Sequence, residues 1–223
     1  MAFNKYQVIK DALSYELANF IFNYFLLKRD AVWWMYQNNI TYDTGLHGTW
    51  SDPQVPNTYS HYADIAMETL LLNVKPKMEK LTGLKLNPTY SYARVYKKGD
   101  ILHRHKDRFS CEISTTMNLG GDEWPIYLEN RKNVGTSDDI DPETGKNYLV
   151  STGNEGKEII LKPGDMLVYK GMILEHWREV FLGDNCAQVF LHYNNKESKD
   201  ADKNIFDTRP HLGLPAYFKG VKI

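Results

Sequence analysis

The chain has 223 residues and 42% hydrophobic residues, which predicts one globular domain with a substantial core. The formal net charge of −1 disfavours a nucleic-acid backbone as a partner. Only two cysteines, Cys111 and Cys186, are present, so we expect small buried thiols in a reducing, cytoplasmic setting rather than a disulfide framework.

The N-terminal segment carries no apolar signal-peptide core. No apolar run approaches the roughly 18 residues that a membrane-spanning helix needs. We therefore expect no membrane association, and nothing in the sequence sets an oligomeric state.

A short strand at Val8-Ile9 is expected before the first helix. Ser14 suits the N-cap position, and Glu16 suits the first turn. The helix is predicted to run to about Gln37. Apolar and aromatic residues recur at helical spacing and predict a core-facing stripe: Leu17, Phe20, Ile21, Tyr24 and Phe25.

Residues 40–60 are rich in glycine and proline and predict an irregular loop. The two histidines in or just after it, His47 and His61, are expected to be surface or structural residues. A second helix is predicted from about Tyr62, with Pro76 ending or kinking it and Gly83 as its C-terminal stop. The two helices together predict a helical layer that backs a sheet.

From Leu84 onward the pattern is that of strands. Residues 90–96 alternate, with Tyr90, Tyr92, Arg94 and Tyr96 on one face. Residues 130–157 are polar and predict a hairpin or long surface loop, which is a candidate lid. The tail around 207–215 is expected to dock on the domain. Further strands are predicted at 111–119, 124–129, 159–161, 166–169 and 188–193.

A turn at 97–100 leads from this first strand to His105-Lys106-Asp107. In extended backbone His105 and Asp107 point to the same side and can take two adjacent positions of one metal ion. A third ligand candidate, His176, follows a later Pro-Gly-Asp turn and an apolar strand. Two imidazoles and one carboxylate with open positions are typical of non-haem Fe(II) oxygenases.

Arg94, flanked by tyrosines just before this motif, suits an anionic co-substrate. The alternative is an edge strand with Arg94 facing solvent, and the sequence favours neither.

These motifs resemble the 2-oxoglutarate/Fe(II)-dependent dioxygenases, in particular the prolyl-4-hydroxylase-like branch. The matching elements are Arg94-x-Tyr96-x-x-Gly99, His105-x-Asp107, Gly120-Gly121, Pro163-Gly164-Asp165, and His176 followed by Gly183.

The resemblance implies a mainly β fold, with a double-stranded β-helix (a cupin-like jelly roll) and N-terminal helices packed on one sheet. The expected organisation is a single domain over 1–223, with a helical support layer at 1–83, a jelly-roll core at 84–195 and a docking tail at 196–223.

By the same resemblance, His105, Asp107 and His176 would be catalytic Fe(II) ligands. The co-substrates would be 2-oxoglutarate and O2, with ascorbate as a candidate reductant. The implied reaction hydroxylates a substrate and releases succinate and CO2. A peptidyl proline and a small metabolite such as an amino acid are both candidate substrates.

The sequence departs from the family at one position. Relatives carry an arginine or lysine some nine to ten residues after the distal histidine, where it binds the far carboxylate of 2-oxoglutarate. Here Asn185 and Cys186 take those positions. The candidates that remain for contacts with the co-substrate are Arg94, Tyr96, Asn185 and Gln188. Arg178 is a weaker candidate because it lies too near His176, one of the implied iron ligands.

Two other hypotheses remain open. The first is a non-catalytic jelly-roll module that binds a metal or another ligand, and the missing cation gives it some support. A cupin-type metalloenzyme would instead use His103, His105, Glu112 and His176. Finally, His192 in the last strand is expected to be a hydrogen-bonded core histidine.

Overall fold

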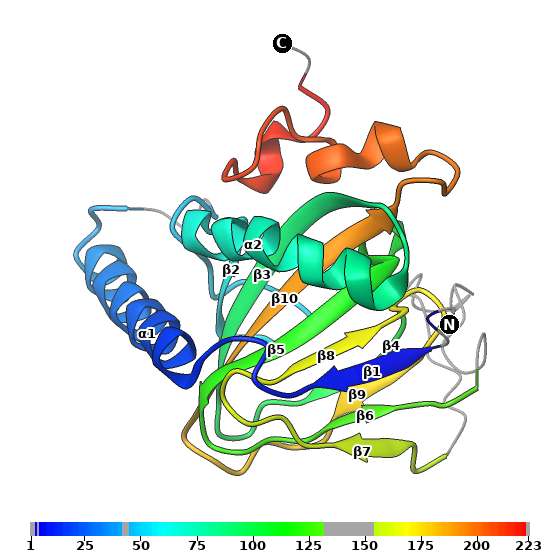
Figure 1. Ribbon diagram of the computed structural model, residues 1–223. Coiled ribbons are helices and arrows are strands. Elements are labelled where there is room, and N and C mark those ends of the chain that lie inside the picture. Colours follow the sequence, from blue (N-terminus) through cyan, green and yellow to red (C-terminus); the bar gives the residue numbers. More distant parts are fainter. Residues whose placement is uncertain (1–2, 4, 42–44, 132–153, 222–223) are drawn as a thin grey trace, which may run out of the picture.

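Two antiparallel β-sheets form the core of the protein. The structure is a computed structural model that describes residues 3, 5–41, 45–131 and 154–221. The larger sheet contains, in spatial order, β1 (Tyr6–Ile9), β8 (Met166–Tyr169), β5 (Ile113–Gly121), β10 (Asn185–Asn195), β3 (Leu86–Lys97) and β2 (Tyr59–Tyr62). The smaller sheet contains β4 (Leu102–His105), β9 (His176–Arg178), β6 (Ile126–Leu128) and β7 (Lys157–Ile159), and it lies below the larger one in Figure 1. This arrangement confirms the predicted jelly roll.

The two faces of the larger sheet have different chemistry because side chains alternate along each strand. On β3 and β10, small and branched residues such as Ala93, Val95, Val189 and Leu191 point outward into the main hydrophobic core. The inward face carries the rings of Tyr90 and Tyr92 and other polar side chains, which line a cavity between the sheets. The apolar outer face therefore requires a cover.

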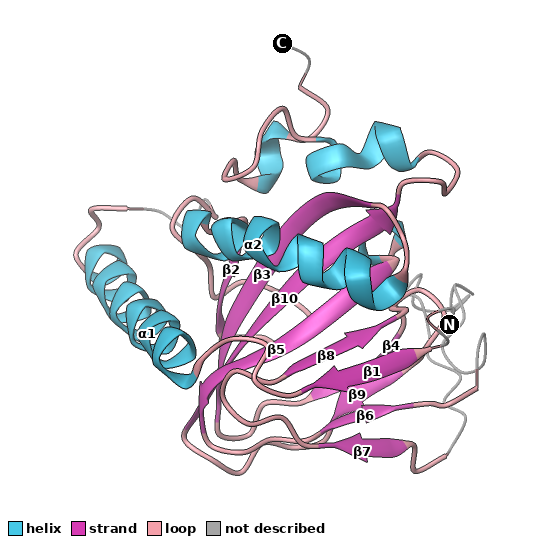
Figure 2. Ribbon diagram, in the orientation of Figure 1, coloured by secondary structure: helices cyan, strands magenta, loops and turns pink. Residues whose placement is uncertain are grey.

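Helices α1 (Tyr15–Gln37) and α2 (Ile65–Thr82) provide that cover, as predicted (Figure 2). The predicted stripe of α1 was partly wrong, because Leu17 and Phe20 are exposed. Ser14 caps α1 by accepting a hydrogen bond from the Leu17 amide at 3.3 Å. Gly83 ends α2 in the left-handed conformation, at φ 70°, which a glycine adopts without strain. The buried faces of α2 and of the larger sheet share one core.

The predicted start of α2 was wrong. Tyr62 is the last residue of β2, and α2 begins at Ile65 after the cap residue Asp64. Pro76 lies inside α2 and does not end it. Both Pro76 and Leu72, whose carbonyl loses its helical partner, lie on the exposed side, so water can satisfy that carbonyl.

The N-terminal 83 residues contribute two edge strands, β1 and β2, as well as helices. Part of the predicted loop at 40–60 is therefore strand, because Tyr59 to Tyr62 pair with β3. The candidate lid at 130–157 lies mostly outside the described residues. No helix in the described ranges is both long enough and apolar enough to span a bilayer.

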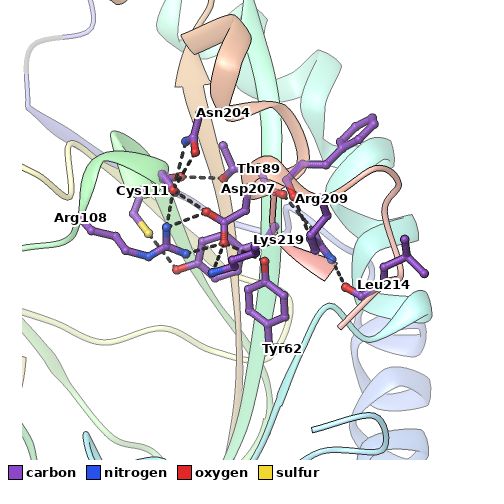
Figure 3. Close-up of polar contacts among 12 residues, drawn as sticks. Tyr62, Thr89, Arg108, Cys111, Asn204, Asp207, Arg209, Leu214 and Lys219 are labelled. Atoms are coloured by element: carbon purple, nitrogen blue, oxygen red, sulfur yellow. Dashed lines mark hydrogen bonds and ion pairs between the residues drawn. The ribbon is translucent and has the colours of Figure 1, made fainter. Parts of the chain in front are cut away.

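The C-terminal tail lies over the open end of the larger sheet, as Figure 1 shows, with η2 (Ala201–Thr208) and η3 (Ala216–Phe218). Polar contacts hold it there (Figure 3). Asp207 accepts two hydrogen bonds from Arg108 at 2.6 and 2.7 Å, and Arg209 pairs with the buried Glu68 at 2.7 Å. Since Arg108 directly follows Asp107, the tail fixes the backbone next to a metal-ligand candidate.

We expect Asp64→Ala to lower the free energy of unfolding by about 3 kcal/mol. Asp64 is buried, caps α2 through the Met67 amide at 3.1 Å and accepts a hydrogen bond from Tyr24 of α1 at 2.8 Å. The change also leaves Lys28 without its carboxylate partner. Urea unfolding measures this, with the exposed Asp30→Ala on α1 as the control. Equal effects of the two changes would contradict the role of Asp64 in joining the helices.

Candidate metal and co-substrate site

Two neighbouring strands bring the candidate ligands together. His105 ends β4 and His176 begins β9, and the two residues are direct partners across this antiparallel pair. Asp107 follows His105 by two residues, and its amide donates a hydrogen bond to the Gly171 carbonyl at 3.0 Å. Residues far apart in sequence therefore meet at one edge of the smaller sheet.

The ligand atoms converge on one small volume. Asp107 Oδ1 lies 3.7 Å from His105 Nε2 and 3.4 Å from His176 Nε2. The three ligand atoms lie within 4.8 Å of one another. Two ligands at about 2.1 Å from a metal and at right angles are roughly 3 Å apart, so small side-chain rotations complete the set. The donor set therefore fits a divalent metal that accepts nitrogen and oxygen ligands.

Backbone carbonyls orient both imidazoles. His105 Nδ1 lies 2.8 Å from the His103 carbonyl, and His176 Nδ1 lies 3.0 Å from the Leu174 carbonyl. A carbonyl accepts only, so in each ring Nδ1 carries the hydrogen. This leaves the Nε2 lone pairs of both rings directed toward Asp107.

A hydrogen-bonded chain orients the Asp107 carboxylate. His192 Nδ1 lies 2.9 Å from Ser114 Oγ, which donates to Asp107 Oδ2 at 3.0 Å. This leaves Oδ1 for the metal. Gly171 provides the space, since a Cβ atom there would lie 2.1 Å from Asp107 Oδ2. His192 is thus the hydrogen-bonded core histidine that was predicted, and it also lines the cavity.

Burial and mutual charge separate the pKa values of the three groups. Burial lowers the pKa of His105 to about 4, so this ring is neutral at physiological pH. Burial opposes charge on Asp107 too, but the His176 and His105 imidazoles outweigh it and hold its pKa below the usual range. Burial also disfavours the charged form of His176, yet the Asp107 carboxylate raises the pKa above the ordinary 6.5.

Metal binding should therefore release protons from His176 and not from His105. At pH 6.5 His176 is more than half protonated, because its pKa is raised, and a metal must displace that proton. Calorimetry of Mn(II) binding in two buffers with different ionisation enthalpies measures the release. We expect between half and one proton per metal at this pH, decreasing as the pH rises through the His176 pKa. Binding without proton release would contradict the His176–Asp107 pairing.

A cavity of about 320 Å³ opens beside the three ligand candidates. Two of its lining residues, Asp52 and Gln54, come from the loop before β2, where the sequence showed no functional signal. Gln54 Nε2 lies 3.4 Å from His105 Nε2, and Asp52 is ion-paired with Arg94. The ion pair between Asp52 and Arg94 thereby holds this loop against the cavity.

The four residues predicted to bind the co-substrate differ in how close they lie to the cavity. Tyr96 lines the cavity, and Arg94 is buried behind it. Gln188 is buried between the sheets and accepts a hydrogen bond from Thr116 Oγ1 at 3.2 Å. Asn185 lies elsewhere, because its side chain accepts from Arg29 of α1 at 2.9 Å on the outer face of the sheet. The structure brings three of the four toward the site.

The cupin-type ligand set does not assemble. His103 is exposed, and Glu112 accepts hydrogen bonds from the Asn195 amide and from Ser198 instead of approaching His105. Within the described ranges, a second group of candidate ligands joins Cys111 and His192 to Asp107. Burial raises the pKa of the Cys111 thiol, which keeps it protonated and makes it a poor ligand.

No protein-family model matches the sequence, and neither does any of the curated proteins searched. Solved structures do match the fold. The chain is 13% identical to HygX from Streptomyces hygroscopicus, solved with nickel, 2-oxoglutarate and hygromycin B, at a TM-score of 0.57 over 88% of this chain and 87% of HygX.

Two further structures resemble the chain. The non-haem α-ketoglutarate-dependent epimerase SnoN from nogalamycin biosynthesis is 12% identical, with a TM-score of 0.58 over 99% of this chain and 91% of SnoN. A Pseudomonas putida prolyl-4-hydroxylase is 14% identical, with a TM-score of 0.51 over 87% of this chain and 94% of that enzyme. The chain thus has the double-stranded β-helix fold of the 2-oxoglutarate-dependent non-haem oxygenases.

Proposed function

We propose that this protein is an Fe(II)- and 2-oxoglutarate-dependent dioxygenase that hydroxylates its substrate. The observation that carries this proposal is the convergence of His105 Nε2, Asp107 Oδ1 and His176 Nε2 within 4.8 Å of one another. Two neutral nitrogen donors and one carboxylate on one side leave the other positions of an octahedral ion open. The nickel and 2-oxoglutarate in the similarly folded HygX support the same assignment here.

Bound iron, 2-oxoglutarate and O2 would supply the oxidation, with release of succinate and CO2, and ascorbate would keep the iron reduced. The chain supplies orientation. His105 and His176 hold fixed tautomers, and Ser114 directs one oxygen of Asp107 toward the metal. Tyr92 and Phe190 help to wall the cavity, which limits the access of water to the reacting groups.

The proposed substrate is a small molecule or the side chain of a peptide. A cavity of about 320 Å³ is at the lower end of the range typical for ligand pockets. Hygromycin B in HygX supports a small molecule, and the prolyl-4-hydroxylase fold supports a peptidyl proline. The proposed location is the cytoplasm, in keeping with two free, buried cysteines.

Succinate formation tests the proposal. Purified protein is incubated with Fe(II), ascorbate, O2 and 2-oxoglutarate, first alone and then with a panel of amino acids, peptides and small metabolites. We expect succinate from the wild type and none from His105→Ala. A non-catalytic binding module would retain tight metal binding yet form no succinate under any of these conditions.

A further inference from the structure

Arg178 is a buried cation that has no carboxylate partner among the described residues. Its side chain is 1% exposed and lies over the Trp124 ring, with the guanidinium carbon 5.0 Å from the ring centroid. Nη1 donates to the Trp124 carbonyl, while Nε and Nη2 make no hydrogen bond within the described part of the chain. A buried charge without a counter-ion is costly, and such a group is expected to have an anionic partner.

The free donors of Arg178 have a specific geometry. Nε and Nη2 form one edge of the planar guanidinium, and their two N–H bonds point the same way. This edge binds the two oxygens of a carboxylate side by side. The site therefore fits a carboxylate better than a neutral or single-acceptor ligand.

Arg94, the other buried arginine between the sheets, offers no such edge. Its Nη2 pairs with Asp52, and its Nη1 donates to Gln54 Oε1 at 3.2 Å. Among the contacts of the described residues, Nε alone is left without a hydrogen bond. A carboxylate binding to Arg94 would have to displace Asp52, so Arg178 is the better anchor.

The position of Arg178 relates it to the metal-ligand candidates. It follows His176 by two residues on β9, so both side chains point to the same side of the strand. Their Cα atoms are about 6.6 Å apart along the strand, which is comparable to the span of a five-carbon diacid. Trp124 connects Arg178 to the cavity, since its ring contacts that of Tyr96 with centroids 4.6 Å apart.

Cys186, at one of the two positions where the family resemblance implies a cation, also lies in this region. Cys186 is fully buried and clusters with Tyr96 and Trp124, the same two rings that connect Arg178 to the cavity. A small thiol at this position leaves room for the guanidinium to approach from the opposite sheet. The buried cation Arg178 thus belongs to β9, whereas β10 carries Cys186 here.

We propose that Arg178 binds the distal carboxylate of the 2-oxo diacid co-substrate, an inference that rests on the proposed function. The 2-oxo acid end of the co-substrate would lie at the metal-ligand candidates, and the far carboxylate would extend past Tyr96 toward the free edge of Arg178. Arg178 is then a co-substrate-binding residue, and Arg94 positions the Asp52 loop.

Equilibrium binding to the Mn(II)-loaded protein tests this proposal without turnover. Two ligands are compared by calorimetry: 2-oxoglutarate and 2-oxopentanoate, which has a methyl group in place of the distal carboxylate. For the wild type we expect a preference for the diacid of about 100-fold, the size typical of a buried charge-assisted pair. Arg178→Met should lower this preference to a few-fold and leave the affinities for Mn(II) and 2-oxopentanoate unchanged.

The matched control is Arg29→Met on α1, whose guanidinium donates a hydrogen bond to Asn185 on the outer face of the sheet, and it should keep the preference. Arg94→Met is compared as the alternative anchor. Arg178→Lys keeps the charge but has no planar edge, so it should retain part of the preference, and it serves as the test variant should Arg178→Met fail to fold. Loss of the preference in Arg94→Met together with its retention in Arg178→Met would overturn the assignment of Arg178 as the carboxylate anchor. The proposed function would not be affected by that result. A metal-loaded wild type that binds neither ligand would overturn the proposed function as well.

Discussion

Replacing Asp107 with alanine is expected to lower the affinity for Fe(II) or Mn(II) by at least about 100-fold and to abolish succinate formation. Changing residues that merely support a ligand commonly costs 10- to 100-fold in affinity, and loss of the ligand itself should cost more. Asp107 is the only carboxylate of the set, and its Oδ1 lies 3.7 Å from His105 Nε2 and 3.4 Å from His176 Nε2. Metal titration followed by calorimetry measures the effect.

His103→Ala is the matched control for this change. His103 lies two residues before His105 but is exposed, and its carbonyl, which orients the His105 ring, is retained in the variant. We expect wild-type metal affinity. Tight metal binding by Asp107→Ala together with weak binding by His103→Ala would contradict the Asp107-centred site and support the cupin-type set.

Arg178→Met is expected to raise the free energy of unfolding of the ligand-free protein by about 2 kcal/mol. An apolar side chain of similar length removes a buried charge that has no carboxylate partner in the described part of the chain. Even for paired buried charges, apolar replacement is often neutral or stabilises by about 1–4 kcal/mol. The same change should reduce the added stability that 2-oxoglutarate gives the metal-loaded wild type, because the affinity for this ligand falls. Denaturant unfolding with and without ligand measures both effects.

Arg94→Met is expected to change the free energy of unfolding in the opposite direction, so it is a useful comparison. Arg94→Met leaves Asp52, whose side chain is 18% exposed, without its ion pair and should lower the free energy of unfolding by about 3 kcal/mol. Destabilisation by both changes to a similar extent would show that Arg178 is a structural residue with a satisfied charge.

Much of the fold was readable from local sequence patterns. Alternation over 90–96 placed the rings and Arg94 on the inner face of β3, and the Ser14 cap and Gly83 stop marked helix ends, because each depends on residues close in sequence. The strand β2 was missed since its pairing with β3 involves residues some thirty positions away. The continuation of α2 through Pro76 likewise depends on which side of the helix faces solvent.

The convergence of the candidate metal ligands was predictable, because residues two apart in extended backbone, such as His105 and Asp107, point to the same side. The supporting residues were not. Gly171 and Ser114 act only through the folded proximity of their strands to Asp107. Arg178 was discounted for being close to His176 in sequence, although that closeness places both side chains on one face of β9.

The most direct test of the central claim is a titration of 2-oxoglutarate into anaerobic protein reconstituted with Fe(II), followed by visible absorption spectroscopy. We predict a metal-to-ligand charge-transfer band that saturates with 2-oxoglutarate and is absent from Asp107→Ala. If the wild type binds Fe(II) but gives no band at millimolar 2-oxoglutarate, the proposed dioxygenase is contradicted and the chain is a metal-binding jelly roll.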